Sequence, residues 1–77
     1  MKPAYQLDLL DAAIVAAIAT RPTGIFTYVV RNIVEREHGY AGITAGKVRK
    51  RLERMEYAGT VKCKRWGPGC HNEWRAA

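Results

Sequence analysis

The spacing of the apolar residues changes once along this 77-residue chain, at Gly59. Before this glycine they recur every three or four positions, which is the period of a helical face; after it they alternate with polar residues, as in a strand. A chain that is helical over most of its length and ends in a hairpin is predicted to be α+β and mostly helical. Residues 1–77 are expected to form one domain, because a chain of this length supports a single small core.

Three helices are predicted before Gly59, over residues 7–20, 27–38 and 44–58. The first has an apolar stripe at the helical period, formed by Leu7, Leu10, Ile14 and Ile18. Alanine fills most of its other positions, which allows other helices to pack closely on more than one side. Leu9 and Val15 lie off the stripe, which indicates either a broad buried face or the contact surface of a homodimer through this helix.

The second and third helices have narrower apolar stripes. Thr27 is predicted to cap the second helix, whose buried residues are expected to be Val29, Val30, Ile33 and Val34. Thr44 is predicted to cap the third helix, and Gly59 to supply the glycine at its C-terminal end. The core stripe of the third helix is predicted to be Val48, Leu52 and Met55. Almost every residue on its opposite side is basic.

The last segment, residues 60–76, is predicted to be a β-hairpin with its turn at Gly67, Pro68 and Gly69. A four-residue loop gives three opposed pairs: Cys63 with Trp74, Lys64 with Glu73, and Trp66 with His71. This register gathers apolar side chains on one face, with Trp74 in the core, and places opposite charges side by side on the other. Lys64 is therefore expected to be partly neutralised by Glu73. Residues 25–26 have the character of a minimal strand.

The net charge is concentrated in residues 44–66. This stretch contains eight basic residues, Lys47, Arg49, Lys50, Arg51, Arg54, Lys62, Lys64 and Arg65. Only Glu53 and Glu56 oppose them, so the stretch carries the whole net charge of +6, and bases and acids cancel elsewhere. A neutral body with one cationic face favours a polyanionic partner, and nucleic acid is the commonest polyanion in a cell.

Three helices followed by a basic hairpin resemble a winged helix-turn-helix domain. Residues 43–61 are similar to the recognition helix and first wing strand of MarR- and PadR-type regulators. These share a capping Thr or Ser, a Val four residues on, a Leu eight residues on, and a final Gly-x-Val. The matching residues here are Thr44, Val48, Leu52, Gly59 and Val61, with Met55 in place of the usual second leucine. The resemblance covers most of the chain and is to the superfamily as a whole.

The resemblance implies a three-helix winged helix-turn-helix with a C-terminal β-hairpin wing. It also implies a small, sequence-specific protein that binds double-stranded DNA, as a transcriptional regulator of the kind that phages and mobile elements carry. The alternative is a winged-helix interaction module that binds an acidic protein partner, and RNA is a third partner that the basic face would suit. Fold alone does not decide between them.

In this superfamily the third helix enters the major groove, with its N-terminal part nearest the base edges. Arg49 and Lys50 are the predicted base contacts, because Arg and Lys pair with guanine O6 and N7. Ala45 and Gly46 would let backbone N–H groups approach a phosphate, to which Lys47 adds its charge, although a tolerated glycine is the simpler reading of Gly46. The full set of predicted DNA-binding residues is Thr44, Ala45, Gly46, Lys47, Arg49, Lys50, Arg51, Arg54, Lys62, Lys64 and Arg65.

Several of these residues also have an ordinary structural interpretation. Arg51 and Arg54 are predicted phosphate contacts, but their stems would equally cover apolar surface. Glu53 and Glu56 would pair within the helix, which would leave a plain solvated face. In the hairpin, Arg65 is the favoured backbone contact. Trp66 is expected to pack on the hairpin itself, with a ribose or groove contact as the alternative.

Other chemistry is not favoured by the sequence. The residues that could bind a metal or form a disulfide are Cys63, Cys70, His71 and His38, and their spacing lacks the close pairs of a zinc site. The chain contains no catalytic motif, so neither an enzyme nor a cofactor is expected. It shows no secretory signal, and its longest apolar run, residues 12–19, is too short to span a membrane. A cytoplasmic protein without membrane association is expected.

Overall fold

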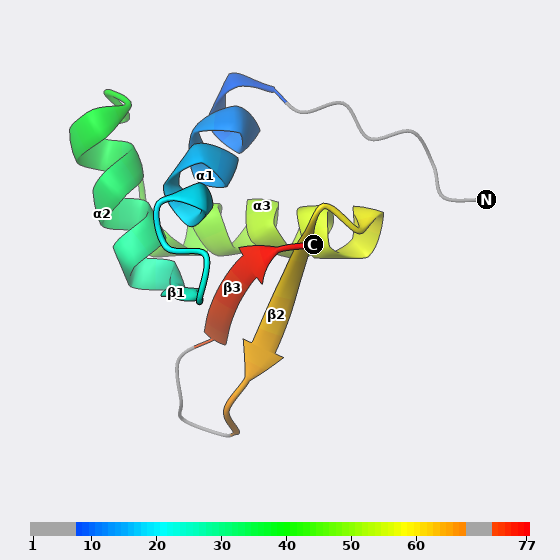
Figure 1. Ribbon diagram of the computed structural model, residues 1–77. Helices are drawn as coiled ribbons and strands as arrows, with labels where there is room; N and C mark the ends of the chain where they lie inside the picture. The colour runs from blue at the N-terminus through cyan, green and yellow to red at the C-terminus, as the bar shows by residue number, and fades with distance from the viewer. Residues whose placement is uncertain (1–7, 68–71) are drawn as a thin grey trace.

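The computed structural model describes residues 8–67 and 72–77. They form three helices and one three-stranded antiparallel sheet (Figure 1). In chain order the elements are α1 (Leu9–Ala19), β1 (Ile25–Phe26), α2 (Thr27–Glu37), α3 (Ala45–Ala58), β2 (Val61–Arg65) and β3 (Asn72–Ala76). The predicted α+β, mostly helical class is confirmed, and each helix begins and ends within two residues of its predicted bounds. None of the described helices is long and apolar enough to cross a membrane.

Helix α1 begins at a capping box formed by two aspartates. The Asp8 carboxylate accepts a hydrogen bond from the backbone N–H of Asp11 at 2.8 Å, and the Asp11 carboxylate accepts one from the backbone N–H of Asp8 at 3.3 Å. The prediction of a broad buried face holds for Val15, which packs against the core, but is wrong for Leu9, which is 83% exposed. Leu9 is the first residue of the helix, where it lines an open groove with Ala12, Ala13, His38 and Tyr40.

The start of helix α2 differs from the prediction. Thr27 does not cap this helix: it is the first helical residue, Phe26 occupies the cap position, and no side chain caps the helix there. The reason is that α2 follows β1 without an intervening loop. The Thr27 hydroxyl instead accepts a hydrogen bond from the indole Nε1–H of Trp74 at 2.8 Å. Thr27 therefore satisfies the single polar group of the largest core side chain.

Helix α3 begins and ends as predicted. The Thr44 hydroxyl accepts a hydrogen bond from the backbone N–H of Lys47 at 3.1 Å, and Gly59 ends the helix in the left-handed conformation with φ of 85°. Its predicted core stripe, Val48, Leu52 and Met55, is fully buried. Because all three apolar side chains are on one side, charged side chains on the other side, such as Arg49 and Lys50, are turned outward.

The sheet has the strand order β1-β3-β2, with β3 in the centre. The predicted register is confirmed at Cys63 with Trp74 and at Lys64 with Glu73. The third predicted pair, Trp66 with His71, is not tested because His71 lies outside the described residues, as does the predicted loop at 67–70 apart from Gly67. Residues 25–26 do form a minimal strand, in which Phe26 is opposite Glu73.

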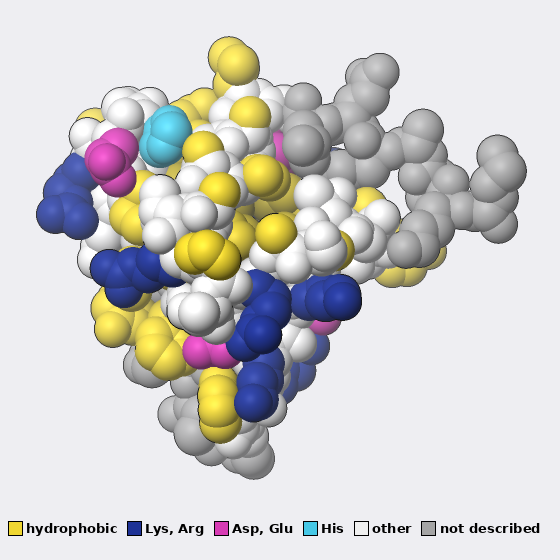
Figure 2. All heavy atoms as spheres, viewed as in Figure 1, with side chains coloured by type: hydrophobic (Ala, Val, Ile, Leu, Met, Phe, Trp, Pro, Cys, Tyr) yellow, Lys and Arg dark blue, Asp and Glu magenta, His cyan; other side chains and the backbone are white. Residues whose placement is uncertain are grey.

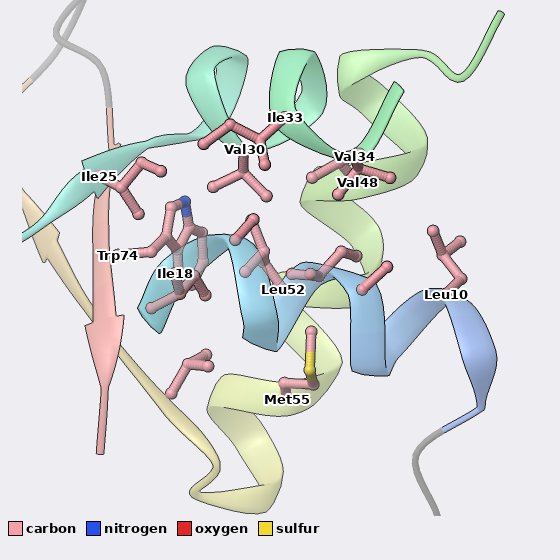
Figure 3. Packing of buried hydrophobic residues seen from close by; sticks show 14 of the residues in the cluster. Leu10, Ile18, Ile25, Val30, Ile33, Val34, Val48, Leu52, Met55 and Trp74 are labelled. Atoms are coloured by element: carbon pink, nitrogen blue, oxygen red, sulfur yellow. The ribbon is translucent and has the colours of Figure 1, made fainter. Parts of the chain in front are cut away.

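The core lies between the three helices and the inner face of the sheet. Trp74 projects from β3 into it and lies beside Ile18 of α1, Ile25 of β1 and Val30 of α2 (Figure 3). In Figure 1, α3 crosses behind the hairpin, and it contacts β2. The basic helix and the basic strand are therefore neighbours in space as well as in sequence.

Candidate nucleic-acid interface

The outward side of α3 carries a row of basic side chains. Four of them are exposed, and we call this set the α3 row: Lys47, Arg49, Lys50 and Arg54. The buried stripe on the other side of the helix fixes their direction. Tyr57, which the sequence analysis did not single out, extends this surface toward the C-terminal end of α3 and is 78% exposed. Its position seven residues after Lys50, on the same helical face, was the available signal.

The first turn of α3 is open to solvent. Thr44, Ala45, Gly46 and Lys47 are all exposed. A Cβ atom added at Gly46 would meet no atom within 4 Å, so packing does not require glycine there. The backbone N–H of Lys47 is already bonded to Thr44, which leaves the N–H groups of Ala45 and Gly46 at the helix start.

Arg51 is half-buried and is bound by carboxylates at the start of α1, unlike the residues of the α3 row. Its guanidinium forms ion pairs with Asp8 and, at 3.4 Å, with Asp11, whose side chain is 2% exposed. Arg51 holds the pKa of Asp8 below its ordinary value, helped by the backbone N–H of Asp11, and Asp8 in turn raises the pKa of Arg51. This side chain ties α3 to the start of α1. Sequence reasoning missed the contact, because the partners are 43 and 40 positions away.

Arg65 has a similar role between the hairpin and α3. Its guanidinium donates two hydrogen bonds to the Glu56 carboxylate, at 3.1 and 2.9 Å. Arg65 thereby lowers the pKa of Glu56, and Glu56 raises the pKa of Arg65. The predicted pairing of Glu56 within its own helix is wrong, because Arg65 follows Val61 and Cys63 on the inward side of β2 and reaches across to α3. Arg65 is the hairpin residue that the sequence favours as a contact to the nucleic-acid backbone. In the structure it instead bridges β2 and α3.

The outer face of the hairpin carries a second group of cations. Lys62 and Lys64 are exposed on β2, and Arg75 lies opposite Lys62 on β3. Figure 2 shows Lys and Arg side chains gathered over the hairpin, with apolar side chains beside them. The Lys64 ammonium lies 4.0 Å from the centre of the Trp66 ring, so Trp66 packs on its own hairpin as predicted while 53% of it stays exposed. We call Lys62, Lys64, Trp66 and Arg75 the hairpin face.

The expected neutralisation of Lys64 by Glu73 is wrong, because Glu73 is bound by Arg75 instead. The two residues are opposite each other, but the Glu73 carboxylate accepts a hydrogen bond from Arg75 at 3.0 Å. The Glu73 side chain lies over Gly24, where an added Cβ would be 2.5 Å from Glu73 Cδ. Arg75 also donates a hydrogen bond to the carbonyl of Thr23 at 3.1 Å. Arg75 and Glu73 together therefore hold residues 23–24, in the loop before β1, against β3. Among residues 8–67 and 72–77, no carboxylate forms a salt bridge with Lys64.

The cysteine and histidine chemistry considered from the sequence has little support in the described part of the chain. Burial raises the pKa of the Cys63 thiol, which keeps it protonated at neutral pH. Within residues 8–67 and 72–77, no three His, Cys, Asp or Glu side chains come close enough to hold a metal ion. Cys70 and His71 lie outside these residues.

Comparison with known proteins returned no match: no family model fits the chain, and no curated protein or solved structure is significantly similar to it.

Proposed function

We propose that this protein is a small winged-helix protein that binds double-stranded DNA, with α3 in the major groove and the hairpin as the wing. The observation that carries the proposal is the α3 row, a set of exposed cations on a helix whose opposite side is completely buried. A helix about 10–12 Å across matches a major groove about 12 Å wide. The order of three helices and a basic hairpin supports the same conclusion.

The contacts divide by position within the proposed interface. Arg49 and Lys50 lie in the second turn of α3 and would reach base edges. Lys47 and Arg54 lie nearer the two ends of the exposed side and would contact phosphates. Lys62 on the hairpin would contact the backbone beside the groove.

Two of the predicted DNA-binding residues take a different role in this proposal. Arg51 and Arg65 are bound by carboxylates of the protein, so we assign them to holding α3 against α1 and against the hairpin. A recognition helix must keep a fixed angle to the wing if both are to contact one duplex. Burial of Val48, Leu52 and Met55 fixes α3 in the core, and the two bridges would add to that rigidity. The proposed role as a regulator of transcription depends on sequence-specific duplex binding, so a protein that does not bind duplexes specifically would not have this role.

Fluorescence anisotropy with a labelled duplex selected from a random pool tests the proposal. The three phosphate contacts proposed above predict that log K falls with log salt with a slope of about −2.7. The variant Arg49→Ala/Lys50→Ala is expected to weaken binding at least about 30-fold, since each base contact is worth about 1–3 kcal/mol. The control Arg21→Ala/Arg36→Ala removes the same charge from exposed positions outside the α3 row and should weaken binding much less.

Equal losses in the two double variants would contradict base reading by α3. Failure of the wild-type protein to bind any duplex at low salt, together with binding to an acidic protein, would favour the interaction-module alternative. A homodimer through α1 stays a prediction, and sedimentation of the protein with and without the duplex decides it.

A further inference from the structure

Of the hairpin face, the proposed duplex binding uses Lys62, but it leaves Lys64, Trp66 and the neighbouring aromatic rings without a role. In an antiparallel pair, residues opposite each other share a face of the sheet. Lys62 with Arg75 and Lys64 with Glu73 therefore lie on the solvent side, while Trp74 lies on the core side. The row through Glu73 continues to Phe26 on β1. The solvent side of the sheet is thus a mixture of cations and aromatic rings.

The aromatic rings on this side are accessible. Trp66 is 53% exposed and Tyr28 is 49% exposed. The Tyr28 ring is stacked on that of Phe26, with centres 6.2 Å apart and planes 11° from parallel. The core is already filled by Trp74, so the fold does not require a second tryptophan at the end of β2.

The charges on this face are unevenly satisfied. Glu73 is the acidic residue of the two pairs, and Arg75 binds its carboxylate. Within residues 8–67 and 72–77, no carboxylate forms a salt bridge with Lys62 or Lys64. The Lys64 ammonium instead lies over the Trp66 ring, which places a positive charge beside an exposed aromatic face.

We propose that the hairpin face binds single-stranded nucleic acid, with unpaired bases stacked on Trp66 and the Phe26–Tyr28 pair, and the phosphates beside Lys62 and Lys64. Stacking platforms beside lysines are the means by which proteins hold single strands, because every base has an aromatic face and every nucleotide a phosphate. A duplex keeps its base faces inside the stack and cannot offer them to Trp66. The site is separate from the α3 row and does not depend on duplex binding.

Titration with labelled oligothymidylate and oligouridylate of about 12 nucleotides, within the range of roughly 4–16 that single-strand folds occupy, tests the proposal. Stacking on Trp66 should quench tryptophan fluorescence, and the buried Trp74 provides an internal reference. In Trp66→Phe the remaining Trp74 emission should not change on titration. Anisotropy should show at least about fivefold weaker binding for Trp66→Ala. Comparison of the two oligonucleotides tells DNA from RNA.

Two further variants keep the test independent of folding and of duplex binding. Lys62→Ala/Lys64→Ala should make the slope of log K against log salt shallower by about 1.4, or 0.7 for each phosphate contact. Arg49→Ala/Lys50→Ala should bind the oligonucleotides as the wild-type protein does, although it loses the duplex. Urea unfolding of each variant confirms that it is folded.

The proposal is overturned if the wild-type protein binds neither oligonucleotide. It is also overturned if Trp66→Ala and the lysine variant, both folded, bind as the wild type does. Loss of single-strand binding in Arg49→Ala/Lys50→Ala would place the strand on the α3 row and contradict the proposal as well. Unchanged duplex binding in that same variant would instead count against the proposed function, so the two failures are distinguishable.

Discussion

The two tryptophans of the hairpin have opposite surroundings. Trp74 is fully buried and its indole N–H is bonded to Thr27, whereas Trp66 is half exposed beneath a lysine ammonium. The arginines of α3 divide in the same way: Arg51 is bound by two carboxylates of α1, while Arg49 faces solvent. The inner side of the basic stretch is thus fixed by partners within the molecule, whereas Arg49 and Trp66 on the outer side are exposed to solvent.

This difference teaches that the net charge overstates the surface available to a partner. Arg51 and Arg65 belong to the eight basic residues of the stretch, but each is bound by carboxylates of the protein. Residue type does not separate the two groups, since α3 contributes Arg51 to the bound group and Arg49 to the exposed one. What separates the two groups is their position relative to the buried side of the helix or strand. Each of the following variants tests whether the inner and outer sides differ.

The largest contrast is expected between the two tryptophans. Trp74→Ala should lower the free energy of unfolding by about 3–5 kcal/mol, because it leaves a large cavity in the core. Trp66→Ala should change it by less than about 0.5 kcal/mol, as surface substitutions usually do. Urea unfolding measures both. A similar loss in the two variants would show that the outer face of the hairpin is also structural.

The next largest effect is expected at Arg51. Arg51→Met keeps much of the stem but leaves the buried Asp11 carboxylate without its guanidinium, which should cost about 1–3 kcal/mol of unfolding free energy. Lys50→Met, one position earlier and exposed, is the matched control and should have little effect. Equal stability of the two variants would refute the assignment of Arg51 to the inner side.

The local signals of the sequence predicted the fold because they act over short separations. Thr44 caps the helix that begins at the next residue, Gly59 ends the same helix, and Cys63 pairs with Trp74, only 11 positions away. The Thr27 cap failed where a strand runs directly into a helix, a junction that the pattern of polar residues did not reveal.

The candidate site was predicted less completely, since its inner contacts depend on how the elements pack. Nothing near Arg51 in the sequence indicates Asp8, which reaches it only because α1 lies against α3. Glu56 and Arg65 are nine positions apart, but they meet only after the chain reverses at Gly59. The direction of Arg49 and Lys50 did follow from the sequence, because the apolar stripe alone determines it.

A smaller effect is expected from acid. The folded-state pKa of Asp8 lies below its ordinary value, mainly because of Arg51, so its ion pair contributes stability above the unfolded pKa of about 3.9. That contribution is lost as the pH falls through the folded-state pKa. The urea midpoint of Asp8→Asn should therefore depend less on pH between neutral and acid conditions than that of the wild type. Parallel pH profiles would contradict the role of this pair.

The smallest effect is expected from releasing Arg65. Glu56→Gln removes the carboxylate that binds it and frees one cation beside the proposed duplex. The slope of log K against log salt for duplex binding should become steeper by about 0.9, the value of one further phosphate contact. Glu53→Gln removes the same charge from an exposed position of α3 and serves as the control. An equal change in both variants would mean that only net charge matters.

The division into an inner and an outer side is tested most directly by duplex titrations of two double variants of equal charge. Arg49→Ala/Lys50→Ala changes the outer side, and Arg51→Met/Arg65→Met changes the inner side. With both variants folded, we expect a loss of affinity of at least about 30-fold for the first and less than about threefold for the second. Comparable losses in the two variants would contradict the division.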